Sequence, residues 1–481
     1  MTEWIGAADA ARRLGIKPAS LYSYVSRGVL ARRTAPDGRA SQFDAAEVDR
    51  LARKGRPRRP AGKSGLIIGS ALTEIRDGEL RYRGLDAVRL AAQRSFEDVA
   101  ELLWTGALPA APGPPWRATE QAVAVAAAAQ AALPAATLPL ERLQVIVPAL
   151  AATDPLRLEL GQPAVVTAAR SMIAGMTDCL PPAPGPAASS PAAFSPAASS
   201  LAVSSPAAPE TAAVTSGLPA RTATAGVPAA QPLVPEAPVI MSSPSDASVS
   251  LGSGAPGDPP GSSIAARLVS RLCPGEPPAG LAGVVQSALV LTIDHELAAS
   301  TLAARAAASV RADPYAVVAT GLGAVGGALH GGASLGAELM LDAAAGPADA
   351  PRVIGELLRR GERIPGFGHF VYTGGDPRAM ALLAAVRRLA PGSPKVAVAG
   401  EIISEAHRRG LPQPNIDFAL AALATAAGLI RGAGEAIFAV ARTAGWLAHG
   451  IEEYQRATPI RPRGIYTGPD GDRESARPAG H

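Results

Sequence analysis

The sequence contains few cysteines and few aromatic residues, and it has no long uncharged apolar run. Two cysteines in 481 residues, Cys179 and Cys273, cannot form a disulfide framework or a four-cysteine metal site. Because aromatic residues make up 4% of the chain and apolar residues 48%, we expect a core of helices packed through alanine, leucine and valine. The chain also lacks a signal pattern and the apolar run of roughly 18 residues that a bilayer span needs, which predicts a cytoplasmic protein.

Positive charge is concentrated near the N-terminus. The whole chain carries a net charge of only +4, but residues 1–63 carry fourteen basic against six acidic side chains. The remainder is therefore slightly acidic. Such a local positive field indicates either a polyanionic partner or a solvated terminal segment.

Two short helices joined by a tight turn are predicted near the N-terminus. One is amphipathic over residues 4–16 and the other over residues 18–28, and each is ended by glycine. A hairpin with Asp37–Gly38 at its tip follows, and a further helix is expected from Phe43 onward. This layout over residues 1–55 resembles the winged helix-turn-helix of the MerR family.

Basic side chains in this module would contact DNA phosphates. The candidates are Lys17, Arg27, Arg32, Arg33 and Arg39. These side chains would equally keep a small domain in solution, and the module would equally serve as a docking or oligomerisation unit. The sequence leaves DNA binding open, and residues 56–63 form a basic linker to the rest of the chain.

Helical patterns dominate the rest of the chain. A hairpin is predicted over residues 75–84, and a helix with Ser95 as its N-cap follows. Helical periodicity occupies residues 140–176 and most of the stretch 264–445. Between these two, residues 181–262 are rich in proline, alanine and serine with almost no charge, which predicts a disordered insertion. A segment that docks a partner is the alternative interpretation.

All six histidines lie at or after residue 295. Three of them, His295, His330 and His369, have polar or glycine neighbours, which suits donation of a proton or hydrogen bond close to a ligand. Their wide spacing disfavours a zinc site. The run Gly321–Gly326 matches the dinucleotide pattern GxGxxG, but it follows a helical pattern rather than a strand. We therefore expect neither a metal nor a nicotinamide cofactor.

The motifs around these histidines, with others in a fixed order, resemble the citrate synthase family. The matching runs are Tyr82–Gly84 with Ser95–Glu97, His295–Thr301, Gly327–Ala333, Gly366–His369 with Asp376–Arg378, Pro414–Phe418, and Ala441–His449 with Arg461–Pro462. The resemblance covers residues 64–180 and 263–470, and it implies a mainly α, two-domain helical fold that closes over its substrates.

In that fold the domains are assembled from separate stretches of the chain. The large domain would comprise residues 64–180, 263–332 and 426–470, the small domain residues 333–425, and a tail residues 471–481. The resemblance also implies a homodimer or larger assembly.

The resemblance further implies a reaction of the tricarboxylic acid cycle type. Acetyl-CoA or propionyl-CoA would condense with oxaloacetate, and hydrolysis would release CoA with citrate or 2-methylcitrate, without a cofactor. Asp417 would remove a proton from the acyl group, His330 would hold the thioester oxygen, and His369 would polarise the 2-oxo carbonyl. The substrate-binding residues would be His295, Arg378, Arg442 and Arg461, the last supplied by the neighbouring subunit. Taken alone, Asp417 would also be interpreted as a helix N-cap.

Four positions depart from the commonest family pattern. They are Ala298, Ala328, Phe370 and Gly450. None removes a catalytic group, but Phe370 lies beside His369 and leaves the preferred acyl donor and 2-oxo acid open. A second class of function also stays open, namely a transcriptional regulator whose N-terminal module binds DNA and whose body senses a carboxylic acid or a CoA ester.

Overall fold

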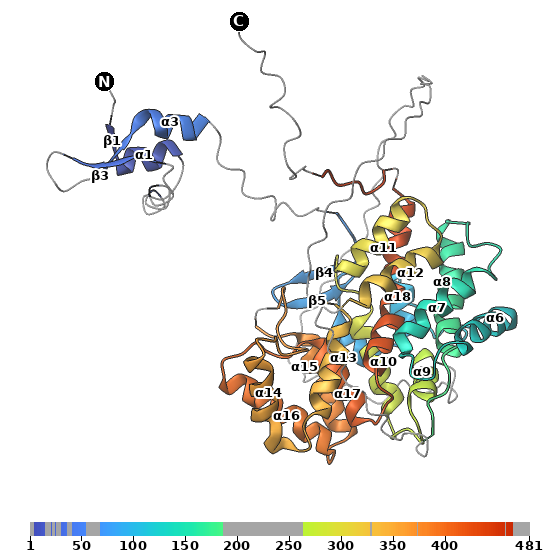
Figure 1. The fold of residues 1–481 in the computed structure, drawn as a ribbon. Coiled ribbons are helices and arrows are strands. Elements are labelled where there is room, and N and C mark those ends of the chain that lie inside the picture. Colours follow the sequence, from blue (N-terminus) through green and yellow to red (C-terminus); the bar gives the residue numbers. More distant parts are fainter. Residues whose placement is uncertain are drawn as a thin grey trace, which may run out of the picture. The chain divides into compact units, whose positions relative to one another are not determined.

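A computed structural model describes most of the chain. It covers residues 4–14, 21, 25, 30–35, 41–53, 68–185, 263–327, 330–372, 374–456 and 458–464. The chain falls into two compact units, Met1–Ser70 with Arg461–His481, and Ala71–Ile460 (Figure 1). Within the described ranges no helix is long and apolar enough to cross a membrane. Most of the insertion predicted at 181–262 lies outside the described residues.

The N-terminal part of the first unit is a small α/β module. Its elements are β1 (Trp4–Gly6), α1 (Ala7–Leu14), β2 (Arg32–Thr34), β3 (Ser41–Asp44) and α3 (Ala45–Arg53). The antiparallel sheet has the order β1-β3-β2. Its own core contains Ile5, Ala10, Ala11, Leu21, Leu30, Phe43, Ala45 and Val48.

Two boundaries in this module differ from the prediction. Residues Trp4–Gly6 form a strand rather than the start of a helix, because they pair with β3. Phe43 likewise lies in β3, and α3 begins only at Ala45, where the Asp44 carboxylate accepts a hydrogen bond from the Ala46 amide. The predicted hairpin strands are confirmed by the β2–β3 pairing. Its tip and most of the second predicted helix (18–28) lie outside the described residues, so the helix-turn-helix remains a prediction.

The second unit begins with a hairpin that packs on helices. Strands β4 (Thr73–Arg76) and β5 (Glu79–Tyr82) are antiparallel, and the short β6 (Leu85–Asp86) pairs with β5. The turn at Asp77–Gly78 has φ values of +53° and +82°, which confirms the predicted hairpin. The buried Tyr82 hydroxyl donates a hydrogen bond to a carbonyl of the helical body.

Helices form the rest of this unit, as predicted from composition and periodicity. Those before the insertion are α4 (Ala87–Gln93), α5 (Phe96–Thr105), α6 (Glu120–Ala131), α7 (Pro139–Ala151) and α8 (Gln162–Asp178). Those after it are α9 (Ile264–Leu272), α10 (Leu281–Thr292), α11 (Ala299–Ser309), α12 (Pro314–Val325), α13 (Gly332–Asp342), α14 (Ala350–Arg359), α15 (Pro377–Leu389), α16 (Pro394–Arg408), α17 (Ile416–Ala426) and α18 (Ala433–Tyr454). A short 3₁₀ helix, Pro347–Asp349, precedes α14. Ser95 caps α5 as expected.

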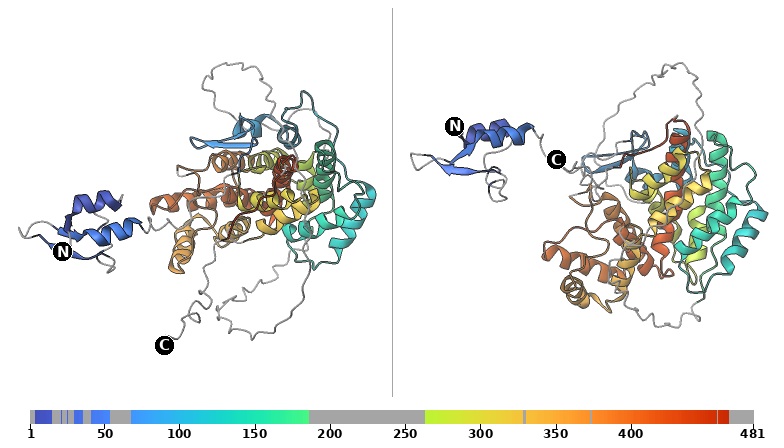
Figure 2. Two further views of the ribbon diagram at one scale, coloured as in Figure 1. Left: turned by 90° about the horizontal axis from the view of Figure 1, so that it is seen from above. Right: turned by 45° about the horizontal axis from the view of Figure 1, so that its top comes forward.

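The long helix α18 forms the centre of the unit. Almost every residue in its 22-residue span is buried, and it packs against α5, α7, α8, α10, α11 and α12 (Figure 1). A Cβ at Gly445 would lie 2.2 Å from the Ile293 carbonyl oxygen, so this glycine lets α18 approach the end of α10. The views in Figure 2 show α14 to α17, drawn in orange, grouped at one end of the unit. The predicted small-domain boundaries, 333 and 425, remain predictions.

The GxGxxG run is helical, as its context predicted. Gly321 to Val325 form the last turns of α12. A Cβ at Gly321 would lie 2.6 Å from the Trp446 ring, so this glycine makes room for an indole of α18.

Candidate active site

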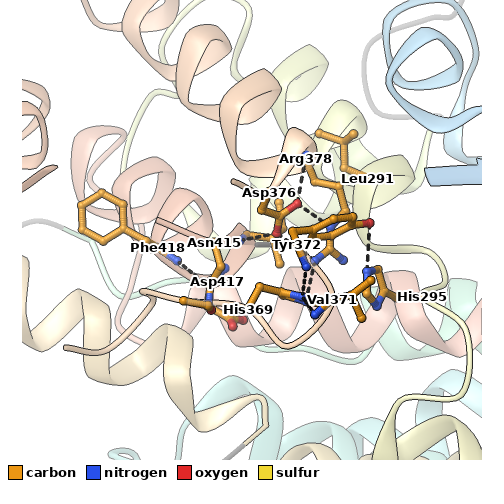
Figure 3. A network of polar contacts seen from close by, with 12 residues as sticks. Leu291, His295, His369, Val371, Tyr372, Asp376, Arg378, Asn415, Asp417 and Phe418 are labelled. Atoms are coloured by element: carbon orange, nitrogen blue, oxygen red, sulfur yellow. Dashed lines mark hydrogen bonds and ion pairs between the residues drawn. The ribbon is translucent and has the colours of Figure 1, made fainter. Parts of the chain in front are cut away.

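The candidate residues of the second unit lie at helix ends and in the loops beside them. His295 follows α10, His330 precedes α13, and His369 lies in the loop before α15. Arg378 and Asp417 lie in the first turns of α15 and α17. Arg442 alone comes from the middle of a helix, α18. Figure 3 shows one part of this site.

A buried ion pair joins the starts of α15 and α17. Asp376 accepts hydrogen bonds from Arg378 Nε at 3.0 Å and Arg378 Nη2 at 2.8 Å, and each of the two residues is at most 2% exposed. The Asp376 carboxylate also accepts from the Ile416 amide at 3.0 Å. Burial alone would raise the pKa of Asp376, but the Arg378 guanidinium holds it below its ordinary value. Arg378 is therefore a fixed, charged group.

Asn415 holds the loop that carries His369 against α17. Its side-chain amide donates to the Gly368 carbonyl at 2.9 Å, and its backbone amide donates to the Gly366 carbonyl at 2.8 Å. Gly366 has a φ of +75°, and a Cβ there would lie 2.7 Å from the Cβ of Phe418. The loop and the helix start consequently form one fixed structure (Figure 3).

His369 is held in one tautomer by the backbone. Its Nδ1 accepts from the amides of Val371 at 3.0 Å and Tyr372 at 3.3 Å. A neutral ring that accepts at Nδ1 carries its proton at Nε2. Burial and the charge of Arg378 lower the pKa of His369. Arg378 Nη2, which can only donate, lies farther away, 3.4 Å from Nε2, so the two nearer amides decide the tautomer and the ring presents an N–H donor at Nε2.

His295 and Tyr372 complete this side of the site. His295 Nε2 lies 3.0 Å from the Tyr372 hydroxyl, and the His295 and His369 rings meet edge to face at 5.0 Å. Burial, with Arg378 and Arg442 nearby, lowers the pKa of His295 well below its usual range. His295 is a neutral hydrogen-bonding group at physiological pH.

Asp417 is partly buried, and no described residue hydrogen-bonds its carboxylate. The interpretation of Asp417 as an N-cap is wrong, since Asn415 occupies that position and accepts from the Asp417 amide at 3.0 Å. Burial raises the pKa of Asp417 to about 6, although Arg378 and Arg442 act against the rise. A carboxylate with this pKa is suited to general-base catalysis near neutral pH.

His330 is oriented by a chain of two hydrogen bonds. Trp446 Nε1 donates to Ser300 Oγ at 3.3 Å, so the Ser300 hydroxyl proton is free to point at His330 Nε2, 2.7 Å away. His330 then carries its own proton at Nδ1. Burial lowers its pKa to about 4, with a contribution from Arg442, so the ring is neutral.

Arg442 is a buried cation with unused donors. It is 1% exposed, and its Nε and Nη1 have no hydrogen-bond partner among the described residues. Its guanidinium carbon lies 4.7 Å from the Phe438 ring centroid, and the His330 ring contacts the same phenylalanine. A buried arginine in this state is suited to binding an anionic group of a ligand.

The site thus brings together six of the seven residues predicted for it. The six are His295, His330, His369, Arg378, Asp417 and Arg442. Arg461 is exposed and belongs to the first unit, and the structure does not place it with the others. Three supporting residues were not predicted from the sequence: Ser300, Tyr372 and Asp376. Only Asp376 carries a local signal, since Asp followed by Pro is typical of a helix N-cap with proline in the first turn.

The predicted DNA-binding residues are only partly described. Lys17, Arg27 and Arg39 lie outside the described residues. Arg32 and Arg33 lie in β2, and the Arg33 guanidinium packs over the Trp4 ring at 4.4 Å. Both arginines are exposed.

Three of the four unusual positions are described. Phe370 is 99% exposed beside His369. Ala298 is the N-cap residue of α11 and offers no side-chain cap, and a Cβ at Gly450 would make only ordinary contacts. Ala328 lies outside the described residues.

The chemistry of the site is that of an anion-binding acid–base centre. Two buried arginines carry positive charge, three neutral histidines can form hydrogen bonds, and Asp417, with a pKa raised to about 6, can act as a base. Within the described ranges no group of three or more His, Cys, Asp or Glu side chains is arranged to hold a metal ion.

Comparisons with known proteins bear on this centre. The sequence model of the family described as citrate synthase, C-terminal domain, matches residues 64–181 and 164–463. The chain is 41% identical over 188 residues to citrate synthase 2 of Bacillus subtilis (strain 168), covering 38% of this chain and 50% of that protein. It is 34% identical over 187 residues to 2-methylcitrate synthase 1 of Corynebacterium glutamicum, covering 38% and 49%. The chain spans about half the length of the curated relatives it matches.

Solved structures show the same fold. The crystal structure of citrate synthase from Thermotoga maritima MSB8 superposes with a TM-score of 0.57 at 21% identity, covering 84% of this chain and 94% of that chain. Citrate synthase from Pyrobaculum aerophilum gives a TM-score of 0.58 at 22% identity, covering 91% and 95%.

Proposed function

The chain belongs to the citrate synthase family, and from this premise we propose that its helical body condenses an acyl-CoA with a 2-oxo dicarboxylate such as oxaloacetate. The observation that carries the proposal is the grouping of a base, Asp417, with a donor, His369, that is fixed at Nε2 beside a buried arginine. Curated relatives named citrate synthase and 2-methylcitrate synthase both match. Either acetyl-CoA or propionyl-CoA therefore fits as the acyl donor.

The first step is removal of a proton from the carbon next to the thioester. This carbon is a weak acid, so the reaction needs a base and a donor for the developing enolate oxygen. The Asp417 carboxylate accepts the proton. His330 donates from Nδ1 to the enolate oxygen, because its Nε2 is occupied by Ser300.

The second step forms the carbon–carbon bond. The enolate carbon attacks the 2-oxo carbonyl, and His369 Nε2 donates its proton to the carbonyl oxygen as this becomes a hydroxyl. Arg378 and Arg442 bind the carboxylates of the 2-oxo acid, and His295 adds a hydrogen bond. In an assembly of the proposed kind, Arg461 of the neighbouring subunit adds a further cation. Water then hydrolyses the thioester to give the free acid and CoA.

The test is release of CoA thiol by the purified full chain with oxaloacetate and either acyl-CoA. Asp417→Ala should lose nearly all turnover with both donors, because removal of a catalytic base costs about 10²- to 10⁴-fold. Glu356→Gln is a matched control, since Glu356 is a half-exposed carboxylate on α14 that pairs with Arg352. No release with either donor by a folded wild-type chain would contradict the proposal.

DNA binding by the N-terminal module is a second candidate function, and with it the proposed role of the body as a sensor of a carboxylic acid or a CoA ester. It is favoured by the antiparallel β2–β3 pair, which carries Arg32 and the stacked Arg33 on an exposed strand. Phosphate contacts release counterions, so each arginine lost should lower the salt slope of binding by about one. Binding of Arg33→Ala to duplex DNA across a salt series tests this. A module that serves only for docking or oligomerisation would show no salt-dependent binding to duplex DNA.

A further inference from the structure

A network of hydrogen-bonded polar groups adjoins the candidate site. It begins at Asp294, the residue before His295, which is fully buried. Asp294 Oδ2 accepts from Thr73 Oγ1 at 2.5 Å and from His449 Nε2 at 3.1 Å. Asp294 Oδ1 has no hydrogen-bond partner among the described residues. This aspartate is therefore held by one of its two oxygens.

The tautomer of His449 follows from its other neighbour. Arg305 Nη1 lies 2.5 Å from His449 Nδ1, and a guanidinium can only donate. His449 Nδ1 must accept, so its proton is on Nε2 and points at Asp294. Arg305 is itself fixed by Glu453 at 2.7 Å and by Glu452 at 2.8 Å. The donor and the acceptor of each hydrogen bond in this buried network are thus determined.

Asp294 also acts on Arg442 across the buried interior. Burial lowers the pKa of Arg442, and Asp294 is the leading charge that opposes this effect. The two described side chains are not joined by an ion pair: Asp294 Oδ2 accepts from Thr73 and His449, and Asp294 Oδ1 is without a partner among the described residues. A buried cation is costly unless a counter-charge is near. Here the counter-charge is near, but it is turned toward Thr73 and His449.

We propose that His449 is a positioning residue for the reaction: with Thr73 it holds Asp294 as a fixed counter-charge that stabilises Arg442 without occupying its donors. Arg442 then stays in place and free to bind the carboxylate of the 2-oxo acid. The inference rests on the proposed function, since it assigns that carboxylate to Arg442. Without the His449 donor, Asp294 turns toward Arg442 and competes with the substrate.

The experiment compares His449→Leu, His449→Gln and Thr73→Val in the full chain. Initial rates of CoA-thiol release are measured against oxaloacetate and, separately, against the acyl-CoA. Loss of one charge-assisted hydrogen bond corresponds to about a 10- to 100-fold effect. We expect KM for oxaloacetate to rise by this factor in His449→Leu, while KM for the acyl-CoA stays within about twofold. Glutamine retains an N–H donor and should recover most of the loss.

Tyr454→Phe is the matched control. It removes a partly buried hydrogen bond at the last residue of α18, from the Tyr454 hydroxyl to the Ala312 carbonyl at 2.6 Å. A merely structural role for His449 would give both variants the same uniform loss of kcat, and this outcome overturns the inference. If His449→Leu does not fold, Thr73→Val decides, because Thr73 is only partly buried.

Failure of the proposed function would look different. A wild-type chain that releases no CoA contradicts the condensing activity, and the inference is then decided by calorimetric titration with oxaloacetate alone. Wild-type binding that weakens in His449→Leu and recovers in His449→Gln supports the positioning role. Equal affinity of the wild type and His449→Leu, or no binding by either, overturns it.

Discussion

Asp376 and Arg378 form a bidentate ion pair, with Arg378 Nε 3.0 Å from Asp376 Oδ1 and Arg378 Nη2 2.8 Å from Asp376 Oδ2. Because the same carboxylate accepts from the Ile416 amide, the pair fixes Arg378 relative to Asp417. One aspartate thus sets the distance between Arg378, the proposed substrate-binding cation, and Asp417, the proposed base.

Asp376→Ala should destabilise the fold and weaken binding of the 2-oxo acid. Removing one partner of a buried pair leaves an uncompensated charge and costs about 3–5 kcal/mol of unfolding free energy. Urea unfolding and KM for oxaloacetate measure the two effects. Glu362→Ala is the control, since it breaks the exposed Arg360 pair and should cost less than about 1 kcal/mol. Equal unfolding midpoints for Asp376→Ala and the wild type would contradict the assigned role.

Activity should fall below pH 6, because the base must be ionised. With the pKa of Asp417 at about 6, kcat/KM should drop about tenfold per pH unit on the acid side. His330, with a pKa of about 4, stays neutral over most of this range. A profile that is flat from pH 7.5 to about 4.5 would rule out Asp417 as the base.

The contribution of Asp417 to the stability of the fold should change with pH in the opposite sense to the activity. The pKa of Asp417 is higher in the folded chain, at about 6, than its ordinary value of 3.8. Folding therefore favours the protonated form, and the contribution of Asp417 to stability is present at low pH and is lost as pH rises through this window. Asp417→Asn should remove this part of the pH dependence. Thermal unfolding of the two proteins between pH 4 and 7 measures it.

Ser300→Ala should lower kcat with little effect on KM for oxaloacetate. Without the hydroxyl, His330 Nε2 loses its donor and the ring is free to take the other tautomer. Loss of one oriented donor to the enolate oxygen corresponds to about a 10²- to 10³-fold loss of kcat. Ser404→Ala, which removes an exposed hydroxyl from α16, is the control. An unchanged kcat in Ser300→Ala would mean that His330 needs no such support.

Two glycines inside helices should respond oppositely to alanine. A Cβ at Gly445 would clash with the Ile293 carbonyl oxygen, whereas a Cβ at Gly323 would meet nothing within 4 Å. Gly445→Ala should therefore destabilise the chain by about 1–3 kcal/mol. Gly323→Ala should stabilise it by up to about 1 kcal/mol, because alanine favours the helix. Paired thermal melts are the measurement, and destabilisation of equal size in both variants would contradict the packing argument.

Local signals in the sequence predicted much of the helical body. The Asp77–Gly78 turn and the Ser95 N-cap are formed by neighbouring residues, so pattern alone was sufficient for both. The strand at Trp4–Gly6 could not be predicted in this way, since it exists through pairing with β3 nearly forty residues later along the chain. Its amphipathic pattern fits a helix equally well.

In the candidate site, too, local motifs were predictive and contacts between distant residues were not. Family motifs pointed to the three histidines, Arg378, Arg442 and Asp417, but their protonation states depend on neighbours that are distant in sequence. Ser300 and Trp446, for example, are 146 positions apart and meet only in the folded body. The capping role given to Asp417 was wrong because Asn415, two residues earlier, already occupies the cap.

The position of the N-cap at Asn415 instead of Asp417 has a practical consequence. Asn415 caps α17 and holds the loop of His369, so the Asp417 carboxylate is not needed for either task. Replacing this carboxylate should therefore leave the helix and the loop in place. An isosteric Asp417→Asn chain should therefore be inert yet intact. Crystals of this variant should bind both proposed substrates together without reaction.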